Sequence, residues 1–127
     1  MCIRDRFSAA WTIGYAARVA PAGLEVLTLS GFTGPFGVLA ASGEPVAEGS
    51  PRPIFQAIKG LCEMAGLAHV AAGTSDETKV LALAGRSTSG KTVTWLANLT
   101  ADDVPVDISA LSRGQFVMAP YAIARFG

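Results

Sequence analysis

The stretch GRSTSGKT, residues 85–92, fits the phosphate-loop pattern G-x-x-x-x-G-K-[ST] at every fixed position. In such a loop, glycine amides and a lysine hold the phosphates of a nucleotide, and the Ser or Thr hydroxyl binds Mg²⁺. This chemistry needs a buried strand before the loop and an α-helix after it, because the helix N-terminus adds further amides and its dipole. The motif therefore predicts nucleotide binding only if a helix begins near Lys91.

The residues that follow the motif favour a strand instead. Lys91 precedes TVTWLAN, which is rich in β-branched and aromatic side chains. Such side chains lose rotamer freedom in a helix and fit a pleated sheet. We therefore expect a hairpin in which residues 80–84 pair with residues 93–97 and residues 86–90 form the loop. Lys91 would then be a solvated charge, and nucleotide binding becomes the weakest functional hypothesis.

The other polar residues that could do chemistry lack suitably spaced partners. His69 has no Cys or His at ligand spacing, so we expect a surface or strand-end histidine. The pairs Asp76-Glu77 and Asp102-Asp103 lie among turn residues, where solvated loop charges are commoner than catalytic carboxylates opposed across a cleft. No serine occupies a G-x-S-x-G elbow. We expect no catalytic residue, no metal and no cofactor.

The composition is apolar and electrically balanced. Half of the residues are hydrophobic and 16% are charged, which is more apolar than an average globular domain. Part of the core is therefore expected to face a missing portion of a larger fold. Ten basic and ten acidic residues give zero net charge, and without a basic patch we expect no nucleic-acid partner. No apolar run approaches the roughly 20 residues of a membrane span, so we expect no membrane partner.

The first residues and the cysteines bear on the origin of the chain. Residues 1–6, MCIRDR, match a translation of a transposase adapter used for DNA libraries. We therefore expect them to be non-native and the natural sequence to begin near Phe7. Cys62 then has no partner cysteine and is expected to be a buried thiol. An unpaired thiol is typical of a reducing compartment, so we expect a cytoplasmic location.

The first half of the chain predicts a helix, a buried strand and a second helix. Apolar residues recur every three or four positions over residues 7–20, and Trp11 and Tyr15 are expected in the core, as is Trp95. Residues 24–29, LEVLTL, form a short apolar run typical of a strand buried on both faces of a parallel sheet. Pro53 begins a second helix over residues 53–65, with Gly66 as its C-cap.

After Gly66 the hydrophobic period changes from about 3.6 to 2 residues. Short extended segments are predicted at residues 79–85, 91–100, 104–109, 115–119 and 121–126. Turn residues separate them, a spacing that predicts an antiparallel sheet or sandwich. The change of period divides the chain into residues 7–66 and 67–127.

The stretch SGFTGPFG, residues 30–37, is a candidate ligand-binding segment because of its position in the predicted fold. It follows the predicted buried strand at its carboxyl end, where α/β folds place their ligands. A tight irregular turn without a binding role explains the same composition. Both interpretations stay open at this point.

Four stretches together resemble the C-terminal part of the D-apionate lactonase family. They are FSAAWTIGYAARVAPAGLEVLTLSGFTGPFG from Phe7, RPIFQAIKGLCEMAG from Arg52, GKTVTWLANLT from Gly90 and MAPYAIARF from Met118. The resemblance implies a (β/α)₈ TIM barrel followed by a β-sandwich. Residues 7–20 would be the seventh barrel helix, residues 24–29 the eighth strand and residues 53–65 the eighth helix. The fold class would thus be an α/β barrel fragment followed by an antiparallel β-sandwich.

The resemblance also implies a function. The intact protein would be a hydrolase that opens a sugar-acid lactone or, alternatively, a barrel glycosidase that cleaves a glycosidic bond. Its catalytic groups would lie upstream of Phe7, so this chain alone would be inactive. Ser30, Thr33 and Phe36 would supply one wall of the pocket for a small sugar-acid or carbohydrate substrate. A structural or carbohydrate-binding β-module without chemistry is the remaining hypothesis.

Overall fold

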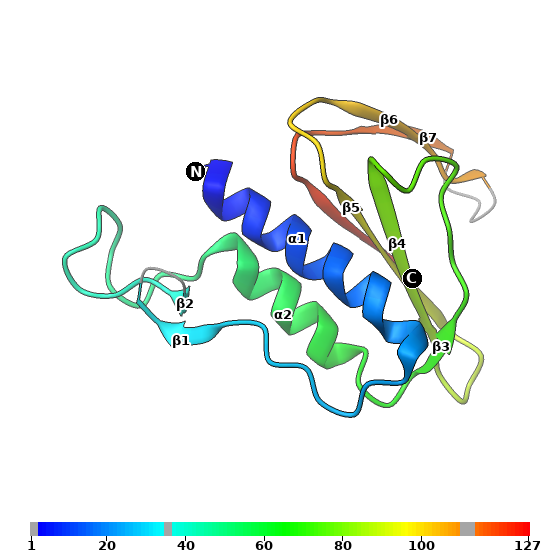
Figure 1. The fold of residues 1–127 in the computed structure, drawn as a ribbon, viewed down its shortest axis with the longest axis horizontal. Coiled ribbons are helices and arrows are strands. Elements are labelled where there is room, and N and C mark those ends of the chain that lie inside the picture. The colour runs from blue at the N-terminus through cyan, green and yellow to red at the C-terminus, as the bar shows by residue number, and fades with distance from the viewer. Residues whose placement is uncertain (1–2, 35–36, 110–113) are drawn as a thin grey trace.

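The computed structural model describes residues 3–34, 37–109 and 114–127. Its elements are α1 (Ile3–Val19), the 3-10 helix η1 (Ala20–Ala22), β1 (Gly31–Thr33), β2 (Gly37–Leu39), α2 (Pro53–Glu63), β3 (Ala68–Val70), β4 (Val80–Arg86), β5 (Thr92–Asn98), β6 (Val104–Asp107), β7 (Gln115–Met118) and β8 (Ile123–Phe126). Helices α1 and α2 lie side by side and begin at the same end of the molecule, where β1 and β2 also lie (Figure 1).

The largest sheet has the order β3-β4-β5-β8, with every neighbouring pair antiparallel. Strand alternation gives this sheet two buried faces. Leu83, Trp95 and Ala97 belong to the core shared with the helices, whereas Val80 and Leu96 pack in a second core with residues of the β6–β7 hairpin. The result is a central sheet with helices on one face and a two-stranded sheet over part of the other.

Helix α1 packs through a face of small residues. Ala9, Ala10, Ile13 and Ala16 recur at helical spacing and are buried in the core shared with the large sheet. Gly14 lies on the same side, where an added Cβ would come within 3.0 Å of the Leu99 side chain. These small residues allow the helix to approach the sheet closely.

Helix α2 begins as predicted at Pro53, whose fixed φ suits the first helical position. Its buried residues Ile54, Ala57 and Gly60 follow a three-residue spacing. Gly60 lies against the indole of Trp95, so the Trp95 ring fills the space between the helix and β5 and leaves no room for a Cβ at position 60. The helix ends at Glu63, two residues earlier than predicted, and its C-cap is Met64 rather than Gly66. Gly66 has φ +83°, a left-handed conformation suited to the turn that follows.

The second half of the chain confirms the predicted antiparallel architecture. Strands β5 to β8 each fall within one of the predicted segments, and β4 exceeds its predicted segment by one residue, Arg86. Strand β4 pairs with β5 so that Leu83 faces Trp95. The short strands β1, β2 and β3 were not predicted as strands. Each has three residues, too few to produce a recognisable alternation.

The strand predicted over residues 24–29 is wrong. Residues 24–30 form no strand, and Leu24, Val26 and Leu27 are exposed. A strand buried on both faces needs a neighbour on each edge and a layer on each face. Within the described part of the chain no strand pairs with this segment, and its apolar side chains therefore stay in solvent.

Two further predictions about burial are also wrong. Trp11 and Tyr15 are 47% and 40% exposed, because α1 turns its alanine face to the sheet and leaves these rings on the other side. They stack on each other with ring centroids 4.9 Å apart. Cys62 is exposed, because the inward positions of α2 are 54, 57 and 60. Trp95 is buried, as predicted.

Candidate functional site

A cleft of about 340 Å³ lies at the end of the molecule where α1 and α2 begin. Helix α1 supplies one wall, and the chain on both sides of the β1–β2 connection supplies the other. The lining residues are Arg4, Asp5, Phe7, Ser8, Trp11, Thr12, Leu29, Ser30, Gly37, Arg52 and Ile54. Apolar and aromatic surface with a few convergent polar groups is the usual lining of a small-molecule site.

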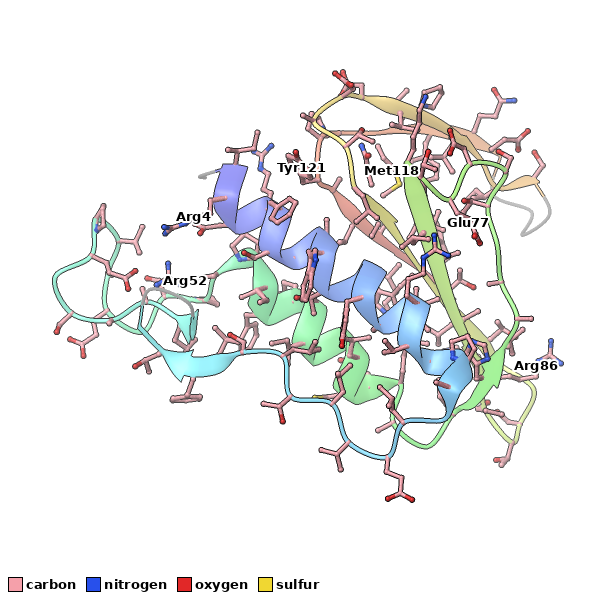
Figure 2. The ribbon with its side chains drawn as sticks, viewed as in Figure 1. Arg4, Arg52, Glu77, Arg86, Met118 and Tyr121 are labelled. Atoms are coloured by element: carbon pink, nitrogen blue, oxygen red, sulfur yellow. The ribbon has the colours of Figure 1, made fainter. Side chains whose placement is uncertain are left out.

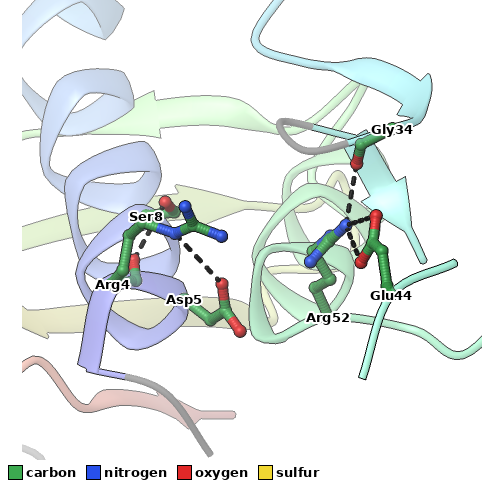
Figure 3. A network of polar contacts seen from close by, with 6 residues as sticks. All are labelled: Arg4, Asp5, Ser8, Gly34, Glu44 and Arg52. Atoms are coloured by element: carbon green, nitrogen blue, oxygen red, sulfur yellow. Dashed lines mark hydrogen bonds and ion pairs between the residues drawn. The ribbon is translucent and has the colours of Figure 1, made fainter. Parts of the chain in front are cut away.

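Arg52 holds one side of this cleft. The proline that follows Arg52 favours an extended backbone at this residue, which has φ −84° and ψ 165°. From there the Nη2 atom donates to the Gly34 carbonyl at 2.7 Å and to both carboxylate oxygens of Glu44 at 2.6 Å (Figure 3). The Arg52 backbone N–H donates to the carbonyl of Val38 at 3.0 Å. One residue therefore ties the start of α2 to three points of the preceding connection.

Glu44 is held from two directions. Its Oε1 atom accepts the Ala41 N–H at 3.1 Å as well as the Arg52 guanidinium. The Ala41 N–H and then Arg52 hold the pKa of Glu44 below its ordinary value of 4.5. The Arg52 and Glu44 side chains are only 11% and 19% exposed, so their charges are partly removed from water. Removing either partner of such a pair destabilises the protein, because the other charge is left buried without a counter-charge.

Arg4 and Asp5 form the opposite, more exposed side of the cleft. Arg4 Nε lies 3.9 Å from the Asp5 carboxylate, and the Ser8 hydroxyl donates to the Arg4 carbonyl at 3.1 Å. Arg4 and Arg52 lie at the same end of the molecule (Figure 2). The Arg4 side chain is 64% exposed, and a loosely held surface pair of this kind contributes little to stability.

The three residues predicted to bind substrate lie in different settings. Ser30 lines the cleft, is half-buried, and donates its hydroxyl to the Gly31 carbonyl at 3.2 Å. Thr33 is exposed on β1 and is not among the lining residues. Phe36 lies outside the described residues. The structure thus brings Ser30 to the cleft and keeps Thr33 on the neighbouring surface.

Gly37 sets the shape of the wall beside Ser30. A Cβ at this position would overlap the backbone of Thr33. The approach is close because β1 and β2 are parallel strands joined by a short connection, in the register Gly31 to Gly37, whereas parallel strands ordinarily need a long crossover. Only glycine fits here.

The GRSTSGKT stretch is a hairpin loop, as predicted. It joins β4 to β5, and Thr92 begins a strand rather than a helix. The Gly90 N–H donates to the Ser87 carbonyl and the Lys91 N–H to the Ser87 hydroxyl, so these amides are used within the turn. Arg86 projects from this end of β4 into solvent (Figure 2). The loop therefore lacks the helix that a phosphate site requires.

The remaining polar candidates are surface residues. His69 is exposed on β3, and Asp102 and Asp103 are exposed in the turn after β5. Asp76 accepts hydrogen bonds from the Thr78 hydroxyl and N–H, and Glu77 pairs with Arg18 at 3.4 Å. Among residues 3–34, 37–109 and 114–127, no three His, Cys, Asp or Glu side chains cluster as metal ligands. In the same ranges no helix is long and apolar enough to cross a membrane.

The Arg52–Glu44 pair was missed by sequence reasoning. The two residues are eight positions apart in a connection rich in glycine and proline, with no helical or strand spacing to relate them. The one available signal was the presence of opposite charges in an otherwise sparsely charged segment. Such a signal is too common to assign a contact.

The helices and sheets define the class of protein. A helical segment with a mainly apolar cleft at the N-terminal ends of its helices is followed by an antiparallel, sandwich-like β-domain. The chain is therefore a mixed α/β protein in which two packed helices precede an antiparallel β-domain.

Comparison with known proteins identifies the family. Residues 3–66 match the profile described as "D-apionate lactonase, TIM barrel domain", and residues 77–126 match "D-apionate lactonase, C-terminal immunoglobulin-like domain". The chain therefore belongs to the D-apionate lactonase family, which confirms the resemblance. The D-apionate lactonase of Brucella anthropi is 36% identical over 118 residues, which are 93% of this chain and 18% of that protein. The chain thus spans less than a fifth of its relative. No solved structure matches it.

The origin of residues 1–6 stays a prediction. Both α1 and the barrel-domain match begin at Ile3.

Proposed function

We propose that this chain is the non-catalytic C-terminal part of a sugar-acid lactonase. The observation that carries the proposal is the succession of the two family matches, a barrel domain and then an immunoglobulin-like domain, along one short chain. The catalytic groups of the intact enzyme would lie in the upstream part of the barrel. Opening a lactone adds water across the ring ester, so the ring oxygen leaves as a hydroxyl and the carbonyl carbon becomes a carboxylate.

The cleft at the start of α1 and α2 supports a contribution to the substrate pocket. Active sites of (β/α)₈ barrels lie at the end of the barrel where the helices begin, because the βα loops gather there. Ser30 lines the cleft at this end. In the proposal Ser30, Thr33 and Phe36 form one wall of the pocket, with hydroxyl groups that suit a polyhydroxylated sugar acid.

A chimeric enzyme tests the proposal. The matching segment of the Brucella anthropi lactonase is replaced by residues 7–127 of this chain, and hydrolysis of the lactone of D-apionate is followed by acid release. We expect turnover by the chimera and none by the isolated chain. The variant Ser30→Ala should raise KM several-fold, because a lost hydrogen bond to bound substrate costs about 1 kcal/mol. A matched control is Ser42→Ala, at an exposed loop serine, which should leave KM unchanged.

Three outcomes would contradict parts of the proposal. Turnover of the lactone by the isolated chain would contradict its non-catalytic role. If Ser30→Ala and Ser42→Ala behave alike, residues 30–37 are a turn and not a wall of the site. If the protein encoded by the full gene cleaves nitrophenyl glycosides and leaves the lactone intact, the glycosidase alternative replaces the lactonase.

The carbohydrate-binding alternative receives less support from the β-domain. Its groove lies between β4, β5 and β6 and has a volume of about 820 Å³. Aliphatic, small polar and a few charged side chains line the groove, and none of its described lining residues is aromatic. Ligand sites are ordinarily rich in aromatic side chains.

A further inference from the structure

The backbone contacts within the connection from β1 to α2 differ between its outer loop, residues 40–50, and its inner segment, residues 30–34. Its outer loop is closed by Ala40 N–H donating to the Ser50 carbonyl at 2.9 Å and by Gly49 N–H donating to the Ala40 carbonyl at 2.8 Å. The inner segment that carries Ser30 and Thr33 is held by the three-residue strand pair β1–β2 and by the Gly37 N–H bond to the Gly34 carbonyl. Strand β2 is in turn held by the Arg52 backbone N–H bond to the Val38 carbonyl and by the bridge between Leu39 and Pro51, which do not need the Arg52 side chain. Strands this short are weak on their own.

Arg52 adds the contact that joins these two parts. Its Nη2 atom reaches the Gly34 carbonyl in the inner segment and the Glu44 carboxylate in the outer loop. Its Nε atom is buried without a hydrogen-bond partner among the described residues. A guanidinium desolvated to this degree depends on its carboxylate partner, because an unpaired buried charge costs several kcal/mol.

We propose that Arg52 is a positioning residue and Glu44 its anchor, which together hold the Ser30–Gly34 segment as a wall of the cleft. The inference deepens the proposed function, since it concerns the same pocket. Arg52 touches the wall and acts on substrate through it. Sequence position alone gives no such role to either residue, and neither belongs to the predicted site.

The geometry explains why arginine is suited to this position. A single nitrogen must lie within 2.7 Å of three oxygen atoms on two separate segments. The lysine side chain is shorter than that of arginine and carries a compact, strongly hydrated charge. Lysine would keep the attraction to Glu44 without spanning to Gly34, so Arg52→Lys should be intermediate between the native residue and Arg52→Met.

Hydrogen exchange of the complete 127-residue chain tests the proposal without requiring turnover. The readout is the protection of the β1 and β2 amides relative to the amides of β4 and β5. We expect Arg52→Met to reduce protection in β1 and β2 by about tenfold, with β4 and β5 unchanged, because local opening is independent of the core. Arg52→Lys should restore part of the loss.

The exposed pair Arg18–Glu77 provides a matched control. It is also an ion pair, at 3.4 Å, but its side chains are 58% and 46% exposed. The variant Arg18→Met should leave β1 and β2 protection at the native level. If Arg18→Met and Arg52→Met have equal effects, or if Arg52→Met lowers protection uniformly over the sheet, the pair has a general stabilising role and the proposal is wrong.

The pH dependence separates positioning from simple packing. The charged groups that act on Glu44 are Arg52 and, from α1, Arg4. Native β1 and β2 protection should fall as the pH drops below about 4.5, because protonation of Glu44 removes the anchor. Glu44→Gln should show weakened protection that no longer changes over this range. A pH dependence retained in Glu44→Gln would overturn the role of Glu44. A failed lactonase assay with the expected exchange results would overturn the proposed function alone.

Discussion

At the scale of single residues, Gly60 shows how packing overrides helix propensity. Alanine is favoured over glycine inside a helix by about 1 kcal/mol. At Gly60, however, a Cβ would overlap the Trp95 ring, which is buried in the core between α2 and the sheet. Overpacking of this kind costs about 1–3 kcal/mol. We therefore predict that Gly60→Ala lowers the free energy of unfolding, as measured by urea denaturation.

Gly14 in α1 is the matched control for Gly60. A Cβ there would lie 3.0 and 3.3 Å from methyl groups of Leu99 and Leu81. The ends of two leucine side chains can move, whereas an indole fixed between a helix and a strand cannot. Gly14→Ala should therefore be tolerated better than Gly60→Ala. The reverse order would show that α2 and Trp95 are not packed as described.

Asn98 organises the turn after β5. Its side chain is fully buried and donates Nδ2 to the carbonyls of Asp102, Ala119 and Met118 at 2.9–3.3 Å. Its Oδ1 atom accepts the N–H and the hydroxyl of Thr100 at 2.9 and 2.8 Å. We predict that Asn98→Leu destabilises the chain by about 2–4 kcal/mol, because buried carbonyls and an N–H lose their partners. Thermal denaturation measures this loss.

Thr100→Val supplies the comparison for Asn98→Leu. It removes the hydroxyl contact to Asn98 and two longer contacts to the Asp102 backbone, at 3.2 and 3.3 Å, and keeps the backbone N–H that donates to Asn98. Its effect should be about 1 kcal/mol or less. Equal losses in the two variants would mean that the three carbonyl contacts of Asn98 contribute nothing.

At the scale of elements, the sequence predicted the helices and strands whose position is determined by a local residue pattern. Alternation and β-branched residues located β4 and β5, and Pro53 located the start of α2. The strand predicted at residues 24–29 required pairing partners that the described chain does not supply. The local pattern could not predict which face of α1 is buried, because both its alanine face and its aromatic face are apolar. Of the candidate site, Ser30 was predicted at the cleft end, but the Arg52–Glu44 contact depends on how the loop folds back.

Asp107 and Ser109 are hydrogen-bonded at the end of the β6–β7 hairpin. Asp107 accepts the hydroxyl and the N–H of Ser109, and these contacts hold its pKa below the ordinary 3.8. A lowered folded-state pKa stabilises the folded form above the unfolded value, and this contribution is lost as pH falls through the folded pKa. We predict that β6 and β7 amide protection falls below about pH 3.8. Asp107→Asn should remove that dependence while keeping a side-chain acceptor, and an unaltered profile would contradict the assignment.

At the scale of the whole molecule, the two family segments share one core. Ala10 and Ile13 of α1 and Ala57 of α2 are buried with Leu83 and Trp95 of the sheet. The matched barrel segment and the matched β-domain therefore stabilise each other across the change of hydrophobic period. The large sheet of the β-domain packs against the face of α1 opposite Trp11 and Tyr15.

Exposed apolar residues on the side of α1 that faces away from the sheet account for part of the high apolar content. Ile3, Phe7, Trp11 and Tyr15 recur every four residues along α1 and are exposed, as are the apolar residues of the segment 24–27. Extended apolar surface of this kind marks an interface. In the proposed intact enzyme, the remaining barrel units would cover the part of this surface that lies outside the cleft, which Phe7 and Trp11 also line. The isolated chain should therefore associate with itself.

We predict concentration-dependent association of the isolated chain in sedimentation velocity. The double variant Trp11→Ser/Val26→Ser should reduce association without lowering the melting temperature, because both side chains are exposed and contribute little to the core. The double variant Lys91→Ser/Arg125→Ser replaces exposed charges on the β-domain and should leave association unchanged. A monomer at all concentrations would show that this surface is compatible with solvent. The high apolar content would then need a cause other than a missing barrel.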